Sequence, residues 1–107
     1  MITNDDNRCA VAINAMLNVL DPEIGLNIVD LGLIYQIDFD DTDSKIYLTM
    51  TLTTQFCPMG ESIAEAVRRA VQNSFPLMRL QLNITFDPHW SNEMISAKGK
   101  IFLNSNV

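Results

Sequence analysis

Hydrophobic and polar residues follow two different periods along this chain, and the periods predict its helices and strands. From about Asp6 to Leu20, apolar residues recur every three or four positions, which predicts an amphipathic helix that stops at Asp21-Pro22. The same spacing returns from Pro58 to about Asn73 and predicts a second helix. The expected buried stripes are Cys9, Ile13, Met16, Leu17 and Leu20 in the first helix, and Ile63, Ala66, Val67, Ala70 and Val71 in the second.

Three other segments alternate apolar and polar residues with a period of two, which is typical of half-buried strands. The first strand is expected between Gly32 and Phe39, and the polar run 40–44 turns the chain back into a second strand to form a hairpin. The third strand is expected from Met78 to Phe86. The predicted inward residues are Leu33, Tyr35, Ile37 and Phe39, then Ile46, Leu48, Met50 and Leu52, then Met78, Leu80, Leu82, Ile84 and Phe86, while Tyr47, Thr49, Thr51 and Thr53 are predicted to point outward.

After the third strand, the segment 90–95 predicts a short helix capped by Ser91 or Asn92, with Met94, Ile95 and Ile101 packing back on the domain. The predicted order is therefore helix, strand, strand, helix, strand, short helix. Two amphipathic helices can cover one face of three strands, which predicts a single two-layer α+β domain over residues 1–107. The helix between the second and third strands makes those strands parallel, so the small three-stranded sheet is expected to be mixed.

The charge of the chain excludes several classes of partner. Seven basic and thirteen acidic side chains give a net charge of −6, so the long-range field repels nucleic-acid phosphates and anionic lipid surfaces. The first residues lack the basic and apolar regions of a signal peptide, and no apolar run approaches the length of a membrane span. We therefore expect a cytoplasmic protein that binds neither nucleic acid nor membrane.

The segment 49–61 carries the strongest chemical signal. A strand ending at Thr53 and Thr54 leads through a short polar loop to Cys57, and Pro58 suits the first position of the helix that follows. Cys57 is then expected at the N-cap, where unpaired backbone N–H groups and the helix dipole favour a thiolate. We predict an accessible Cys57 with a thiol pKa below the usual value of about 8.5. The structural alternative is a small buried residue that fills the corner between strand and helix.

The loop between the first helix and the first strand is too long for a tight turn, and it carries Asp21, Glu23 and Asp30 among apolar residues. We predict that these acids lie within roughly 17 Å of Cys57, the length of about five extended residues, because both loops flank strands of one small sheet. Each acid also has a structural explanation: Asp21 as a turn residue, Glu23 as a solvated charge, and Asp30 as a cap of the Leu31-Gly32 turn.

Three further residues have side chains that are common in functional sites, and two of them also have a structural explanation. Cys9 lies on the apolar stripe of the first helix and is interpreted as a core residue. His89 follows the third strand and is a candidate metal ligand, although a lone histidine is more often structural. Trp90 is a candidate partner-binding residue.

Four short motifs occur in a fixed order along the chain. They are Asp21-Pro22-Glu23-Ile24, Asp30-Leu31-Gly32-Leu33-Ile34, Thr53-Thr54-Gln55-Phe56-Cys57-Pro58 and Phe86-Asp87-Pro88-His89-Trp90. Together, over residues of about 8 to 103, the chain resembles the PaaD/SufT-like metal–sulfur cluster biosynthetic family, whose eukaryotic relatives serve in cytosolic iron–sulfur protein assembly. The resemblance implies the α/β fold shared with iron–sulfur cluster assembly scaffolds, a functional cysteine at Cys57, and acidic loop positions at Asp21, Glu23 and Asp30. The chain departs from the family at His89, where the family usually has a second proline.

The resemblance implies a role in assembling or delivering iron–sulfur clusters, as a carrier or as an adaptor, with the assembly machinery or client apoproteins as partners. A cluster requires about four thiolate ligands, whereas the chain has one cysteine outside the predicted core. We therefore expect a transient iron–sulfur cluster at most, completed by a client or by a second copy in a homodimer, and no tightly bound cofactor. In the adaptor alternative, Cys57 does not contact iron.

Two other functions use the same residues. A cysteine hydrolase or transferase has Cys57 as nucleophile, His89 as base, and Asp21 or Asp30 to orient the base. A single histidine in the chain and no glycine-rich turn for an oxyanion hole argue against this function, so we expect no enzyme and assign no catalytic residue. A mononuclear zinc module has Cys57, His89 and the loop carboxylates as ligands, although their spacing matches no zinc motif.

Overall fold

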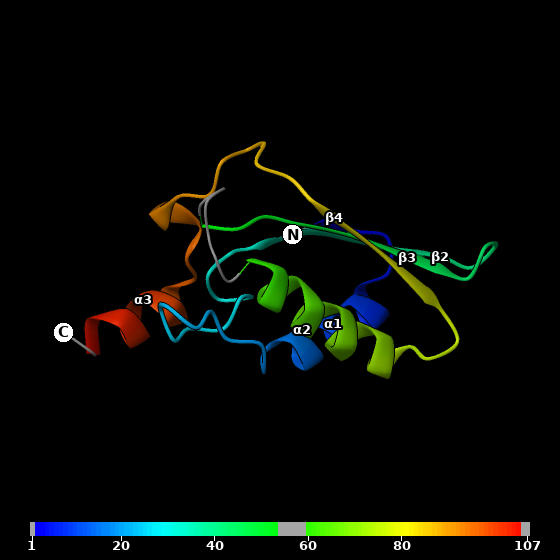
Figure 1. The fold of residues 1–107 in the computed structure, drawn as a ribbon, viewed down its shortest axis with the longest axis horizontal. Coiled ribbons are helices and arrows are strands. Elements are labelled where there is room, and N and C mark those ends of the chain that lie inside the picture. The colour runs from blue at the N-terminus through cyan, green and yellow to red at the C-terminus, as the bar shows by residue number, and fades with distance from the viewer. Residues whose placement is uncertain (1, 54–59, 106–107) are drawn as a thin grey trace.

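The computed structural model describes residues 2–53 and 60–105, which form a mixed sheet with its main helices on one face (Figure 1). This arrangement confirms the predicted α+β class. None of the helices in the described part of the chain has the length and hydropathy to cross a membrane. The elements are β1 (Ile2–Thr3), α1 (Asp6–Met16), β2 (Ile34–Asp40), β3 (Lys45–Met50), α2 (Gly60–Ser74), β4 (Arg79–Ile84), the 3₁₀ helix η1 (Asn92–Met94) and α3 (Ala97–Ser105).

The sheet has four strands in the order β1-β2-β3-β4, so the prediction of three strands was wrong. The predicted hairpin is present as the antiparallel pair β2 and β3, and α2 makes the predicted crossover to a parallel β4. The missed strand, β1, lies parallel to β2 and contains only Ile2 and Thr3. Two residues are too few to show a period of two, so the alternation of the sequence could not reveal this strand.

Asn4 continues the pairing of β1 with a side chain. Its amide nitrogen donates to the backbone C=O of Phe39, and its amide oxygen accepts from the N–H of Phe39, both at 2.9 Å. The side chain thus replaces the backbone of one further strand residue. It closes the edge of β2 beyond the end of β1.

The core lies between the sheet and the two helices α1 and α2, which cover the same face of it (Figure 1). Cys9 is 8% exposed on the inner side of α1, which confirms its interpretation as a core residue. The predicted stripe of α2 is likewise confirmed, with its two outer alanines half-buried. Fully or almost fully buried residues of these elements include Ala12, Met16, Ile37, Phe39, Ile46, Leu48, Met50, Ile63, Val67 and Val71.

The first helix is one turn shorter than the periodicity predicts. α1 ends at Met16, because the following chain bends back and Leu20 pairs with Asn27 in an isolated β-bridge. This bend brings Val19 into the core at 7% exposure. Leu17 and Leu20 are 40% and 55% exposed, so their prediction as buried residues was wrong.

The first predicted strand changes face near its start. Ile34 pairs with Met50 and Gln36 pairs with Thr49, so one extra residue, Tyr35, lies between two successive pairs. Such a bulge shifts the alternation of side chains by one position. Ile34 is therefore buried, and Tyr35 is only half-buried rather than a core residue as predicted.

A third α-helix, α3, follows the predicted short helix η1 and was not predicted. Gly99 lies inside α3, where a glycine weakens the helical signal of the sequence. A Cβ atom at this position would lie 2.9 Å from Ile95 Cγ2 and 3.0 Å from Leu26 Cδ2, so glycine allows α3 to approach the loop 21–31 closely. Ile95 is buried as predicted, whereas Ile101 is 67% exposed and does not pack back on the core.

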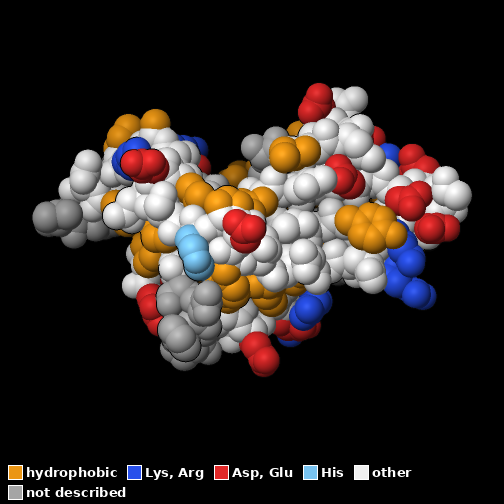
Figure 2. All heavy atoms as spheres, turned by 90° about the horizontal axis from the view of Figure 1, so that it is seen from above, with side chains coloured by type: hydrophobic (Ala, Val, Ile, Leu, Met, Phe, Trp, Pro, Cys, Tyr) orange, Lys and Arg blue, Asp and Glu red, His pale blue; other side chains and the backbone are white. Residues whose placement is uncertain are grey.

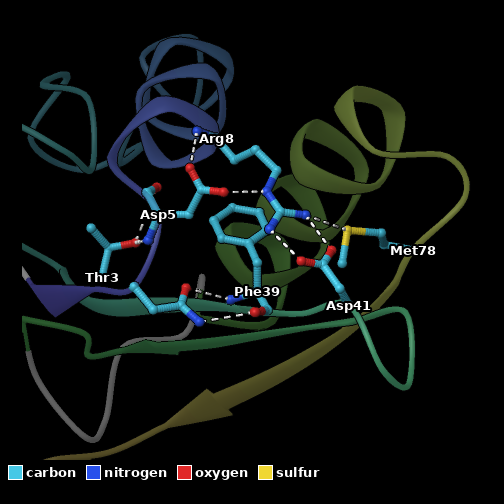
Figure 3. A network of polar contacts seen from close by, with 7 residues as sticks. Thr3, Asp5, Arg8, Phe39, Asp41 and Met78 are labelled. Carbon is cyan, nitrogen blue, oxygen red and sulfur yellow. Dashed lines mark hydrogen bonds and ion pairs between the residues drawn. The ribbon is translucent and has the colours of Figure 1, made fainter.

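Arg8 joins α1 to the turn between β2 and β3 (Figure 3). Its guanidinium contacts the Asp5 carboxylate at 2.6 Å and binds both carboxylate oxygens of Asp41 at 2.8 and 3.0 Å. It also lies over the Phe39 ring, 4.7 Å from the ring centroid. Hydrogen bonds from Arg8 are the largest cause that lowers the pKa of each of these two carboxyl groups. Arg8 thereby holds the start of α1 against the turn of the hairpin.

Candidate functional site

Asp21 holds the loop that follows α1. Its side chain is 2% exposed, and its Oδ1 accepts the backbone N–H groups of Glu23 at 2.9 Å and Ile24 at 3.2 Å. Its backbone C=O accepts the N–H of Gly25 at 2.7 Å. The carboxylate therefore shapes a tight turn, which is the structural role considered for it. Glu23 is exposed on the same turn.

Asp30 connects the loop to the C-terminal helix. Its Oδ2 accepts from the Asn27 amide at 2.7 Å and its Oδ1 accepts from the Ser96 hydroxyl at 2.8 Å. The hydrogen bond from Asn27 is the largest cause that lowers the pKa of Asp30; the Ser96 bond and the charge of Lys98 act in the same direction, and partial burial opposes them. The prediction that Asp30 caps the Leu31-Gly32 turn was wrong, since its side chain binds Asn27 and Ser96 instead.

Ser96 and Asn27 position this acid, and the sequence analysis missed both. Ser96 Oγ also accepts the N–H of Gly99 at 2.9 Å, which makes it a capping residue at the start of α3. A serine before Ala97 is a recognisable helix-start signal. Asn27 Oδ1 accepts the N–H of Asp30 at 2.8 Å, a three-residue spacing that is also typical of a cap.

Trp90 is held against the same loop. Its indole Nε1–H donates to the Leu31 carbonyl at 2.6 Å, and its ring is half-buried against the core. Nearby, the Tyr35 hydroxyl donates to the Pro88 carbonyl at 2.8 Å. These two bonds fix the segment that contains His89, whose exposed side chain lies on the face seen in Figure 2. The aromatic ring of Trp90 thus has a structural contact in addition to its candidate role in partner binding.

The chain after β3 remains part of the core. Thr51 is fully buried, and its N–H donates to the Leu33 carbonyl at 2.8 Å, so its prediction as an outward residue was wrong. Thr53 is half-buried. Thr54 and Cys57 lie outside the described residues. The predicted accessibility and pKa of Cys57, its place at a helix N-terminus and its distance from the loop acids therefore stay predictions.

A groove of about 970 Å³ lies between α2 and the end of β4. Its residues include Leu52 and Gly60, the former two positions before segment 54–59 and the latter directly after it. Cys57 is three residues from Gly60, and three extended residues span about 11 Å at most. The groove is therefore the described cavity nearest in the sequence to the candidate thiol. Its other residues are Glu61, Ser62, Ala64, Glu65, Ala66, Arg68, Arg69, Ile84 and Phe86.

The described residues contain no assembled metal centre. Within residues 2–53 and 60–105, no three His, Cys, Asp or Glu side chains lie together in a group that could hold a metal ion. The carboxylates of Asp21 and Asp30 bind groups of their own loop and of α3. A zinc site or a cysteine–histidine pair would thus have to include Cys57.

Comparisons with known proteins agree with the motifs. A family model described as "Iron-sulfur cluster assembly protein" matches residues 10–79. The chain is 38% identical over 85 residues to "Fe-S protein maturation auxiliary factor SufT" of Staphylococcus aureus, covering 79% of this chain and 96% of that protein. It is 36% identical over 89 residues to "Fe-S protein maturation auxiliary factor YitW" of Bacillus subtilis, covering 83% of this chain and 86% of that protein. A crystal structure of a domain of unknown function, DUF59, from Bacillus anthracis matches with a TM-score of 0.85 and 31% identity, covering 92% of this chain and 93% of that one.

Proposed function

Because the chain belongs to the family of iron–sulfur cluster assembly proteins, we propose that it is an accessory factor for the maturation of iron–sulfur proteins in the cytoplasm. The observation that carries this proposal is the identity of 36–38% to two relatives named as maturation auxiliary factors, over 83% and 79% of the chain. The family model also matches residues 10–79, from α1 to the start of β4. The partners proposed here are the assembly machinery and client apoproteins.

The cluster is cargo in this function, and Cys57 is its proposed ligand. The chain has two cysteines, and Cys9 is buried on the inner side of α1. One remaining thiol cannot complete the shell of about four thiolates that a cluster requires. The proposed carrier therefore holds a cluster transiently, with the other ligands supplied by a client or by a second copy of the chain. A site with incomplete protein ligation suits transfer, because client thiolates can complete the ligand shell of the cluster.

The loop acids support the site through structure in this proposal. Asp21 and Asp30 already bind backbone and side-chain groups, so neither carboxylate is assigned as an iron ligand. They hold the loop 21–31 in shape against α3 and Trp90. Glu23 is exposed on this loop and is the acid proposed to face a partner.

The comparison of Cys57→Ser with Cys9→Ser tests the proposal. At the predicted N-cap, serine replaces cysteine at a cost of at most about 1 kcal/mol, but a hydroxyl is a poor ligand for a soft metal site. Cys57→Ser should therefore fold normally and fail to mature a client. Cys9→Ser places a hydroxyl in the core, so it should lower stability by about 1–3 kcal/mol without removing the reactive thiol.

The measurements are the activity of an iron–sulfur client enzyme in cells that lack the wild-type protein, and the melting temperature of each purified variant. Iron and sulfide content after anaerobic reconstitution, with absorption spectra, should be high for wild type and Cys9→Ser and low for Cys57→Ser. Full client activity with folded Cys57→Ser would contradict the carrier mechanism, and an adaptor role would replace it.

A further inference from the structure

The outer edge of β4 offers backbone groups for pairing. In the parallel pair with β3, the N–H of Arg79 donates to the Ser44 carbonyl at 2.8 Å and the N–H of Thr85 donates to the Met50 carbonyl at 2.9 Å. Alternate residues of a strand direct their N–H and C=O groups to opposite sides. The even-numbered residues of β4 therefore direct theirs away from β3. Among the described residues, no strand lies on this side of β4.

Amide side chains close two other positions at the edges of the sheet. The Gln72 side chain, from the end of α2, donates to the Met78 carbonyl and accepts from the Leu80 N–H, so it occupies the first part of the β4 edge. Asn4 closes the opposite edge of the sheet in the same manner. The edge from Leu82 onward has no such side-chain partner among the described residues.

A groove lies directly beside this open edge. Ile84 and Phe86, at alternate positions, line it from the strand side, and Ala64 lines it from α2. Ile84 is 38% exposed, although its alternation with polar residues predicted it on the inner face. Hydrophobic side chains gather along the lower edge of the view in Figure 2, with acidic and basic side chains beside them. A strand paired to β4 would direct alternate side chains into this groove.

Two exposed arginines of α2 at the rim of the groove can pair with an acidic partner residue. Arg68 and Arg69 lie 3.7 and 3.8 Å from the same carboxylate, Glu65. Glu61 also lines the groove, so the charges of its two arginines and two glutamates sum to zero. The side chains of Arg68 and Arg69 are 53% and 76% exposed, respectively. The chain as a whole has a charge of −6, so the two arginines make this groove less acidic than the chain as a whole.

We propose that an extended segment of a client polypeptide adds to β4 as a fifth strand beside Leu82–Phe86. Its alternate apolar side chains occupy the groove, and an acidic side chain contacts Arg68 and Arg69. Main-chain pairing provides affinity and the groove provides specificity, as in other cases of strand addition. This inference rests on the proposed function, since it specifies how a client is held near Leu52 and Gly60.

A second copy of the chain fits this edge less well than a client segment. Two copies each with a charge of −6 repel one another. An open edge of about five residues is also only about 17 Å long, which is short for the interface of some 1,200 Å² or more that a stable dimer buries. A groove between a strand and a helix has room for one extended chain, whereas a direct β4–β4 contact leaves the groove empty.

The test is a selection of random twelve-residue peptides on the full chain, with counter-selection on Ile84→Pro. Proline at this position removes an outward N–H and keeps the bonds to β3, so the fold should remain. Enriched peptides should alternate apolar residues and contain an acid. A synthetic copy of the best peptide should bind Ile84→Pro about tenfold more weakly or worse and Ile84→Val nearly as well as wild type, since only proline blocks the backbone pairing.

The double substitution Arg68→Gln and Arg69→Gln should weaken binding of the same peptide several-fold, and this loss of affinity should be smaller at high salt. If Ile84→Pro fails to fold, Ile84→Lys replaces it, because an inward charge also blocks an edge. Equal binding to wild type and the folded blocking variant would overturn the inference, as would the absence of any enriched peptide. A wild-type dimer in sedimentation that becomes monomeric in Ile84→Pro would assign the edge to a second copy and equally overturn it.

Failure of this inference is distinguishable from failure of the proposed function. Ile84→Pro should reduce client activity in cells while cluster content after reconstitution stays normal. Normal client activity with folded Ile84→Pro, together with loss of activity in Cys57→Ser, would refute the strand addition and leave the proposed function standing.

Discussion

Replacement of Asp30 by asparagine tests whether its carboxylate has a structural role or acts as a ligand. In the wild type, its two carboxylate oxygens accept one hydrogen bond each, from Asn27 at 2.7 Å and from Ser96 at 2.8 Å. Asparagine keeps one oxygen for Asn27 but presents an amide N–H₂ to the Ser96 hydroxyl. Two charge-assisted bonds of about 1.5–3 kcal/mol each thus become neutral bonds of about 0.5–1.5 kcal/mol at best.

Partial exposure of Asp30 reduces this difference, so we expect Asp30→Asn to lower the free energy of unfolding by about 1–1.5 kcal/mol at pH 7. A change of 1 kcal/mol shifts the melting temperature of a domain of this size by about 4–8 °C. The expected loss is therefore about 4–12 °C. Calorimetry and urea unfolding of both proteins measure it.

The pH dependence of the difference provides a second test. The pKa of Asp30 is lower in the folded state than in the unfolded state. Its ionised form therefore contributes stability that is fully present above the unfolded value of about 3.9 and is lost as the pH falls through the lower folded pKa. The gap between wild type and Asp30→Asn should be constant near neutral pH and should narrow below about pH 4.

Glu23→Gln is the matched control, because Glu23 is an exposed acid on the same loop. Its free energy of unfolding should stay within about 0.5 kcal/mol of the wild-type value. Client activity in cells should fall with Asp30→Asn only as far as the amount of folded protein falls. A variant as stable as wild type that has lost client activity would refute the structural assignment and return Asp30 to the role of ligand.

Three further predictions concern other elements. The alkylation rate of Cys57 should rise with pH through a midpoint below about 8.5, whereas a midpoint at or above that value, or no reaction, would contradict its predicted place at a helix N-terminus. Gly99→Ala should destabilise the protein by about 1–2 kcal/mol in urea unfolding, because overpacking against Ile95 and Leu26 outweighs the helix propensity gained; a stabilised variant would exclude this close packing. Trp90→Phe should cost about 1–2 kcal/mol by thermal unfolding, because the Leu31 carbonyl loses its donor, and an unchanged midpoint would show that this bond contributes nothing.

The sequence predicted the elements that have long, regular patterns. The apolar residues of α2 recur every three or four positions, and those of the hairpin strands recur every two. Both patterns continue over many residues, so the buried faces could be predicted directly from the sequence. The predictions were wrong where tertiary contacts override the local sequence pattern. The β-bridge between Leu20 and Asn27 ends the apolar run of α1 early, and the bulge at Tyr35 inverts the start of β2.

The candidate site was predictable in its residue types but less so in its contacts. The motifs identified the acidic loop and the segment around Trp90, and in the structure Trp90 contacts that loop at Leu31. The partners of Asp30 could not be derived, since Ser96 is far from it in the sequence and its helix contains a glycine. Hydrogen bonds between distant residues leave no period in a single chain.

The bond between Asp30 and Ser96 also sets the order in which the protein can be completed during synthesis. The two residues are 66 positions apart. A ribosome that adds about 5–20 residues per second makes the second partner roughly 3–13 s after the first. Throughout that interval the acidic loop lacks its C-terminal anchor, while α1 has already been made and β2, β3, α2 and β4 are being made. Nascent chains that stop before Ser96 should therefore expose the loop to proteases, which gives the cell a means of removing incomplete copies before they meet a client.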